Sequence, residues 1–405
     1  PGILVALQVA LTCVLLVASG LFVRTLQSLE NVRLGFDPRG VTTLVAMPEN
    51  QKQDPVRSRT METQLLHHFE ALPGVQSVTM QTEIPFSTYN MVLDGTTEIA
   101  GRPFQSGDNA LYSLVSTNFV RTSGISLLAG RGFEQTDEGS ASIVALVNQA
   151  FVKKYLSDRD AIGATLKFHR EKGETDADLP FAQTMTVVGV VENEVQGGDL
   201  SAPYNPMVYL DNLQLPASSF LTQVFTMAAQ YAVRSTLPPE IVAAELRASL
   251  HRDAPGMVEM SLRPMEVGIE KSLGQRRLAL RLVAGFGAAA LVLSAVGIYG
   301  VLAYSVARRR REIGIRMALG STRPEAAALV IRQAGAMVLL GLLPGLAGAW
   351  AAGFAVRGFL YGVRPLDGVT LVTVGGVLLV VAGCAASVPA IRAAMVDPME
   401  ALRTE

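Results

Sequence analysis

The segment RRRREIGIRMALGSTR, at residues 308–323, contains the residue types best suited to binding another protein. Strong positive charge is interrupted there by the apolar pairs Ile313/Ile315 and Met317/Leu319. A short helix that docks in a partner's groove needs apolar anchors with charged flanks. An arginine cluster that only sets membrane orientation needs no ordered apolar residues. We therefore expect docking, with a purely topogenic cluster as the alternative.

Other polar residues indicate neither catalysis nor metal binding. His67 and His68 are adjacent but lack H-E-x-x-H spacing, so a solvated helix face is the preferred interpretation. The acidic pairs at 137–138 and 192–194 lie in expected loops. No G-x-x-x-x-G-K-[ST] segment is present, so this chain has no P-loop of its own for ATP. We expect no catalytic residue, no metal and no cofactor.

Composition points away from a soluble enzyme. Of the 405 residues, 49% are hydrophobic and 17% are charged, whereas soluble domains carry about 25% charged residues. The formal net charge of −1 argues against nucleic-acid binding. The two cysteines both lie in apolar runs, which excludes a disulfide scaffold.

Four uncharged apolar runs predict membrane spans at residues 2–23, 282–306, 334–356 and 369–388. The first run would be about 33 Å long as a helix, which is enough to cross the hydrocarbon core. Helices buried in a soluble core are the alternative, and a cleaved signal peptide is a second alternative for the first run. The spans contain no acidic residue, lysine or histidine, which argues against an ion-coupled carrier.

The arginines predict the orientation of these spans. The loop at 307–325 carries far more arginines than the loop at 357–368, so the positive-inside rule assigns it to the cytoplasm. The N-terminus is then inside, and residues 24–281 are outside. Basic residues just before the second run favour the opposite orientation, but long domains translocate largely regardless of charge.

Residues 25–265 have the composition of a globular domain between the first two spans. Strands are expected at 41–46, 76–80, 143–147, 184–191, 207–210 and 230–233. Helices are expected after the Asp54–Pro55 cap, at 149–156 and after Pro239. The fold class is therefore an α+β membrane protein, with four transmembrane helices and a mixed α/β extracytoplasmic domain inserted between helices 1 and 2.

Two further segments relate the domains to one another. Residues 266–281 are basic and amphipathic and continue directly into the span-rich region at 282–405; they predict a rigid connector, an interfacial anchor, or both. Gly341 and Gly345 flank Pro344 in the third span, with spacing suited to close helix packing and a kink. General enrichment of membrane helices in glycine is the alternative. Residues 1–24 form the first transmembrane helix.

The chain resembles a known family at several motifs. EIGIRMALG at 312–320, directly after a span, resembles the cytoplasmic loop of FtsX-like permeases of the MacB type, and MVDPMEALR at 395–403 resembles their C-terminal signature. SLLAGRGF at 126–133 and the segment at 145–168 resemble their external core domain. The first span followed by LGFDP at 34–38 resembles the second half of duplicated permeases from acidobacteria.

The resemblance implies a permease subunit of an ATP-binding-cassette exporter or mechanotransmission complex in the bacterial inner membrane. Its implied partners are a separate ATPase, a second permease half or homodimer partner, and membrane lipid. The implied ATPase-coupling residues are Glu312, Ile313, Gly314, Ile315, Arg316, Ala318, Leu319 and Gly320. The implied C-terminal motif comprises Asp397, Pro398, Glu400, Ala401 and Leu402.

Other functions fit the same architecture. A non-transport regulator or sensor, such as one that controls a cell-wall hydrolase, is the first alternative, and a membrane-anchored enzyme with its site in the external domain is the second. The chain begins at Pro1 rather than at a methionine. Whether it is one half of a longer permease or a truncated subunit stays open.

Overall fold

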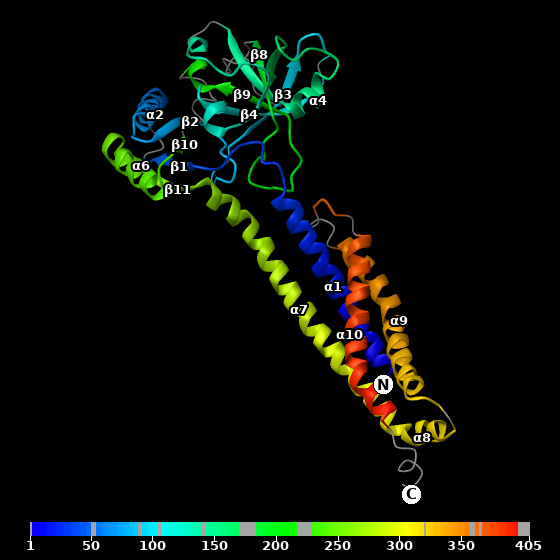
Figure 1. Ribbon diagram of the computed structural model, residues 1–405. Helices are drawn as coiled ribbons and strands as arrows, with labels where there is room; N and C mark the ends of the chain where they lie inside the picture. Colours follow the sequence, from blue (N-terminus) through cyan, green and yellow to red (C-terminus); the bar gives the residue numbers. More distant parts are fainter. Residues whose placement is uncertain are drawn as a thin grey trace. The chain divides into compact units, whose positions relative to one another are not determined.

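The computed structural model of the chain has two compact units. A helical unit comprises Pro1–Asn31 and Leu273–Glu405, and a mixed α/β unit comprises Val32–Ser272. The residues that the structure describes are 2–49, 54–87, 89, 91–103, 105, 107–138, 142–169, 184–216, 229–319, 321–355, 361–363 and 367–395. Figure 1 labels most of the helices and strands used below.

Each predicted apolar run lies in a long helix of the structure, except that Val356, the last residue of the third run, is outside the described residues. These helices are α1 (Gly2–Glu30), α7 (Met265–Arg308), α9 (Arg323–Ala355) and α10 (Gly368–Ala394). All four are long and apolar enough to cross a membrane. Helix α7 contains both the predicted connector at 266–281 and the second apolar run, so one unbroken helix continues from the α/β unit into the helical unit. A short helix, α8 (Arg310–Ala318), follows it.

Close packing of α1 against α9 forms the centre of the helical unit. A Cβ atom added at Gly341 would lie 2.6 Å from the carbonyl oxygen of Ala6, and one added at Gly345 would lie 2.8 Å from the Cβ of Cys13. The two glycines therefore let the helix backbones approach more closely than any larger residue would allow. Pro344 lies between them inside α9.

Polar contacts join further helices of this unit. The hydroxyl oxygens of Thr12 on α1 and Ser294 on α7 are 2.7 Å apart and buried. Asp367 caps α10 by accepting a hydrogen bond from the backbone N–H of Thr370 at 2.8 Å, and it forms an ion pair with Arg24 of α1. An unpaired polar group is costly in an apolar environment, so such contacts help to fix the neighbouring helices.

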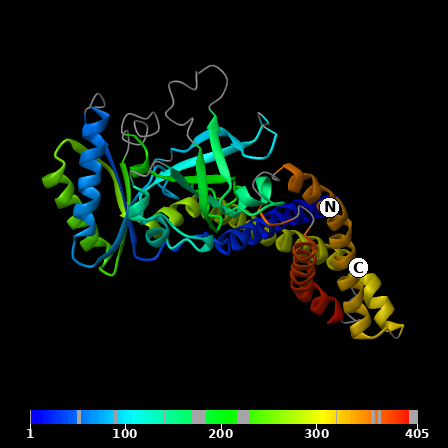
Figure 2. The ribbon, with the colours of Figure 1, turned by 90° about the horizontal axis from the view of Figure 1, so that it is seen from above.

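An antiparallel four-stranded sheet, in the order β11-β1-β10-β2, forms one part of the α/β unit. Its strands are β1 (Val41–Pro48), β2 (Val75–Met80), β10 (Ala229–Ser235) and β11 (Met257–Pro264). Helices α2 (Pro55–Glu70) and α6 (Pro239–Asp253) lie side by side against it (Figures 1 and 2). Asp54 caps α2 as predicted, by accepting a hydrogen bond from the N–H of Val56.

A second, mixed sheet contains seven strands in the order β5-β8-β6-β9-β4-β3-β7. They are β3 (Leu93–Ile99), β4 (Asn109–Val115), β5 (Leu127–Gly130), β6 (Ile143–Asn148), β7 (Thr165–His169), β8 (Met185–Val191) and β9 (Met207–Asp211). The pairs β4–β9 and β6–β8 are parallel, and the others are antiparallel. Because β7 also pairs with β8, six of the strands close into a ring. The short helices are α3 (Phe119–Ser123), α4 (Gln149–Tyr155) and the 3₁₀ turns η1 (Gln135–Asp137) and η3 (Asn212–Gln214).

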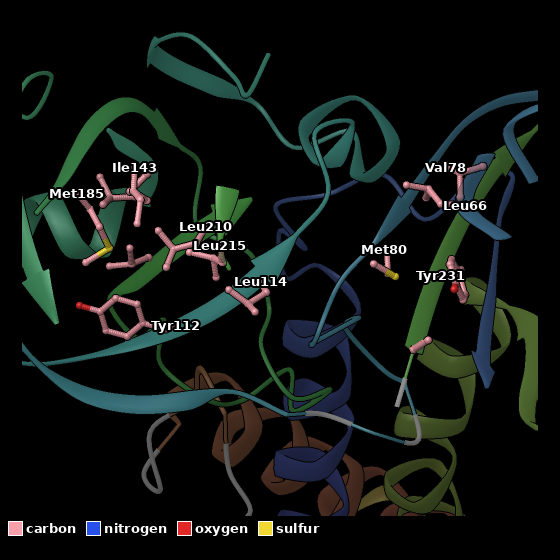
Figure 3. Close-up of a cluster of buried hydrophobic side chains, with 14 of the residues drawn as sticks. Leu66, Val78, Met80, Tyr112, Leu114, Ile143, Met185, Leu210, Leu215 and Tyr231 are labelled. Carbon is pink, nitrogen blue, oxygen red and sulfur yellow. The ribbon is translucent and has the colours of Figure 1, made fainter. Parts of the chain in front are cut away.

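One apolar core continues through both sheets. Figure 3 shows Ile143, Met185 and Leu210 gathered in the second sheet, and Val78 and Tyr231 in the first. Burial of these side chains supplies the main favourable term for folding. The mixed α/β character expected for this domain is confirmed.

Five of the six predicted strands lie within β1, β2, β6, β9 and β10, and the sixth, predicted at 184–191, begins one residue before β8. Strands β3, β4, β5, β7 and β11 were not predicted. Strand β3 has the polar sequence LDGTTEI, and all four residues of β5 are exposed. Strands β3 and β5 therefore lack the alternation of apolar and polar residues by which a strand is recognised from the local sequence. Their pairing with remote segments places them in the sheets.

Candidate functional site

Helix α8 occupies the centre of the arginine-rich segment (residues 308–323), which joins α7 to α9. On its surface, Arg316 Nη2 lies 2.8 Å from Glu312 Oε1, an ion pair between residues four apart. Both side chains are about half exposed, so the pair adds only about 0.3–0.5 kcal/mol to helix stability.

The apolar residues of α8 divide into an inner and an outer set. Ile313 is 5% exposed and packs in the core of the helical unit, and Met317 lies partly against the same core. In contrast, Ile315 is 40% exposed and Leu319 is 83% exposed. Of the apolar residues singled out in the sequence, Ile313 therefore holds α8 to its own unit, while Ile315 and Leu319 form an outward apolar pair.

The turn from α8 into α9 is held by backbone contacts. The N–H of Ser321 donates to the carbonyl oxygen of Arg316 at 3.0 Å, and the N–H of Thr322 donates to Glu325 Oε2 at 3.0 Å. The second contact satisfies a free donor at the start of α9. These contacts hold the first residues of α9 close to the end of α8.

Two groups of predicted residues remain only partly described. Gly314 lies within α8, and Ala318 is its last residue. Gly320 and the C-terminal motif residues lie outside the described residues; that motif comprises Asp397, Pro398, Glu400, Ala401 and Leu402. Their proposed roles therefore depend on the sequence alone.

The first turns of α7 are attached to the α/β unit at Phe86, a contact that the sequence did not predict. Arg263 Nη2 donates a hydrogen bond to the Phe86 carbonyl oxygen at 2.7 Å. A Cβ atom added at Gly268 would lie 3.0 Å from that oxygen, so the helix passes close to the loop. Ser272 Oγ also donates to the carbonyl oxygen of Gly198 at 2.9 Å. The loop residues 83–87 and 196–198 thus form a seat for the start of α7.

Buried carboxyl groups support this seat. Glu83 Oε1 accepts a hydrogen bond from the N–H of Gly197 at 2.6 Å, and Glu194 Oε1 accepts one from the Tyr209 hydroxyl at 2.7 Å. Burial raises the pKa of Glu194 to about 8 and also raises the pKa of Glu83. One of the acidic residues near 192–194 is thus a buried, hydrogen-bonded carboxyl group with a raised pKa, rather than part of a solvated pair.

The two histidines have acidic neighbours on the surface of the α/β unit. His67 Nδ1 lies 3.2 Å from Glu70 Oε2, and His68 Nδ1 lies 3.2 Å from Asp253 Oδ2. Within the described part of the chain, no three histidine, cysteine, aspartate or glutamate side chains gather in a cluster that could hold a metal ion. The candidate functional site therefore lies at the helices and their ends.

Two protein families match successive parts of the chain. Residues 3–251 match the MacB-like periplasmic core domain, and residues 284–398 match the FtsX-like permease C-terminal domain. The second match contains the arginine-rich segment, and the first contains the seat of α7.

Relatives with curated names agree with these matches. The macrolide export ATP-binding/permease protein MacB 2 of Aeromonas hydrophila subsp. hydrophila is 26% identical over 306 residues, which cover 72% of this chain and 43% of that protein. The uncharacterized ABC transporter permease YknZ of Bacillus subtilis is 24% identical over 320 residues, which cover 78% of this chain and 75% of that protein. The chain spans less than half the length of the MacB 2 relative.

A solved structure with a similar arrangement is the periplasmic region of MacB from Actinobacillus actinomycetemcomitans. It shares 15% sequence identity, with a TM-score of 0.38 over 59% of this chain and 94% of that chain. The sequence match to the MacB-like core domain alone covers more than half of the chain. This protein therefore belongs to the FtsX-like permeases that carry a MacB-like periplasmic core domain.

Proposed function

We propose that this chain is the permease subunit of an ATP-binding-cassette exporter that works by mechanotransmission. A separate ATPase would bind the arginine-rich segment, and its closure on ATP would move the helices. The α/β unit would respond on the other side of the membrane. Named export proteins among the relatives support the exporter class.

Helix α7 is the single observation that carries this proposal. It contains 44 residues without interruption, which corresponds to about 66 Å. That length is about twice the hydrocarbon core of a bilayer. At one end, Gly268 lies close to the Phe86 carbonyl oxygen and Ser272 donates a hydrogen bond to that of Gly198; the other end leads within two residues to α8. A continuous helix with both ends held transmits displacement with little slack.

The outward pair Ile315 and Leu319 is the proposed ATPase contact. Two exposed apolar side chains, four residues apart and bordered by arginines, fit the helix-in-groove mode of recognition. Ile313 would contribute indirectly, because its burial fixes how α8 presents that pair. The remaining residues of the loop would shape the helix and the turn that follows it.

The proposed location is the bacterial inner membrane. The four long helices would cross it, the arginine-rich segment would face the cytoplasm, and the α/β unit would face the periplasm. A second permease half or a second copy of the chain would complete the complex. In the alternative function, the same movement of the helices would activate a cell-wall hydrolase outside the membrane instead of exporting a substrate.

A pull-down from membranes, with ATPase activity measured in the recovered complex, tests the docking step. Truncating a buried interface anchor commonly costs about 1–4 kcal/mol of binding free energy. Ile315→Ala with Leu319→Ala should therefore reduce ATPase recovery or uncouple its activity. The control, Leu339→Ala with Leu340→Ala, removes two exposed apolar side chains from a different helix, α9. It should leave the recovery of the ATPase unchanged. Full recovery and full coupled activity of the α8 variant would refute the docking role.

A further inference from the structure

A cleft of about 450 Å³ opens where α7, α8 and α10 meet in the helical unit. Ala303, Val306, Pro389 and Met395 contribute apolar surface to its lining, and Arg310 and Arg392 contribute guanidinium groups. The lining of the cleft therefore combines apolar side chains with two positively charged guanidinium groups. A ligand that fits it must be amphipathic and anionic.

The surrounding charge strengthens this selectivity. Arg308, Arg309 and Arg311 are exposed beside the cleft in sequence, whereas the nearest acidic residue, Glu312, is paired with Arg316. These exposed arginines add positive charge next to the cleft in sequence. Guanidinium groups pair well with phosphate oxygens because their planar donors match the geometry of two acceptors.

The position of the cleft along the helices identifies the source of the ligand. The uncharged run 282–306 of α7 ends just before Arg308, and the run 369–388 of α10 ends just before Pro389 and Arg392. In a membrane, the ends of such runs lie at the level of the lipid headgroups. Basic pockets between helices at this level are suited to anionic lipid headgroups.

We propose that this cleft binds an anionic phospholipid of the leaflet on the side of the arginine-rich segment. Arg310 and Arg392 contact the headgroup phosphate, and the apolar wall from α7 and α10 receives the first part of an acyl chain. The bound lipid joins the end of α7 to the end of α10 beside the segment that docks the ATPase. The proposal needs the membrane insertion of these helices but not the transport function.

Native mass spectrometry of the full chain in detergent, titrated with phosphatidylglycerol or phosphatidylcholine, tests this site. Wild-type protein should retain phosphatidylglycerol in preference to phosphatidylcholine. Arg310→Gln with Arg392→Gln should weaken phosphatidylglycerol binding by about tenfold, which corresponds to the loss of about 1.4 kcal/mol. The matched control, Arg308→Gln with Arg309→Gln, removes equal charge outside the cleft lining and should weaken phosphatidylglycerol binding much less than the Arg310/Arg392 variant does.

A second variant distinguishes binding in the cleft from general electrostatic attraction of anionic lipid. Ala303→Trp fills the apolar part without changing charge, and it should also reduce phosphatidylglycerol retention while the melting temperature is unchanged. Equal retention by the wild type and the Arg310/Arg392 variant would overturn the proposal. Displacement of the lipid by inorganic phosphate alone would overturn it in favour of a soluble anion. Loss of ATPase recovery in the Arg310/Arg392 variant without any change in lipid retention would overturn it in favour of a protein contact.

Discussion

Arg263 donates a hydrogen bond across 2.7 Å to the carbonyl oxygen of Phe86, a residue 177 positions earlier in the chain. Phe86 has φ of +62°, and among the described residues it alone combines a positive φ with a side chain. Left-handed backbone costs a residue with a Cβ atom about 1–2 kcal/mol. The hydrogen bond and the close approach of Gly268 hold this unfavourable conformation at the start of α7.

Arg263→Ala should loosen the seat of α7. Loss of the hydrogen bond removes about 1–2 kcal/mol of local stabilisation, and the Phe86 loop can then relax. Hydrogen–deuterium exchange of the full chain should show faster exchange at residues 83–87 and in the first turns of α7. Arg247→Ala, which removes an exposed ion pair with Glu259, is the control and should leave these residues unchanged. Unaltered exchange in the Arg263 variant would contradict a clamping role.

Gly341→Ala should destabilise the helical unit. Its new Cβ would lie 2.6 Å from the Ala6 carbonyl oxygen, so the backbones of α1 and α9 must separate. Overpacking of this kind costs about 1–3 kcal/mol. Gly335→Ala is a matched control in the same helix, because an added Cβ there meets nothing within 4 Å. Thermal unfolding in detergent should show a lower midpoint for the first variant only; equal midpoints would mean that α9 moves away at no cost.

Glu194 should make the stability of the α/β unit depend on pH. Its folded pKa of about 8 exceeds the value of 4.5 for an unfolded glutamate, so the folded state holds the proton more tightly. The stabilisation is complete below pH 4.5 and is lost as the pH rises toward 8. Glu194→Gln keeps an acceptor for the Tyr209 hydroxyl and removes the titration. Exchange protection of β8 and β9 should fall between about pH 5.5 and pH 8.5 in the wild type, and less in the variant.

Glu83 supplies the control for that experiment. Its pKa is raised by burial as well, so part of the pH dependence should survive in Glu194→Gln and disappear in the double variant with Glu83→Gln. Identical pH profiles for the wild type and Glu194→Gln would contradict the assignment to Glu194.

Membrane orientation can be measured with single cysteines. In a background without Cys13 and Cys384, we expect Ser140→Cys to react with an impermeant thiol reagent from the periplasmic side. Ser321→Cys, in the turn before α9, should react only after the membrane is opened. Labelling of the Ser321 variant in intact spheroplasts, with the Ser140 variant protected, would show that the membrane orientation is the opposite of the predicted one.

Local sequence determined the elements whose stability depends on their own residues. A long uncharged run can satisfy its backbone only as a helix in an apolar environment, so the four apolar runs predicted α1, α7, α9 and α10. Asp54 and Pro55 predicted the start of α2 because the cap and the fixed φ act within one turn. The segment that we propose to bind the ATPase was selected by its composition, since alternating charged and apolar residues can be recognised without knowledge of the fold.

Tertiary structure decided which of those residues face inward and where remote segments meet. Ile313 and Ile315 are equivalent in type, but the packing of α8 buries the first and exposes the second. The exposed strand β5 and the polar strand β3 exist because distant partners supply their hydrogen bonds. Phe86 adopts its left-handed conformation next to Arg263 and Gly268, and the pKa of Glu194 is raised because strands from elsewhere in the chain exclude water. These contacts join residues far apart in the chain, so their energies depend on the folded neighbours and not on local residue types.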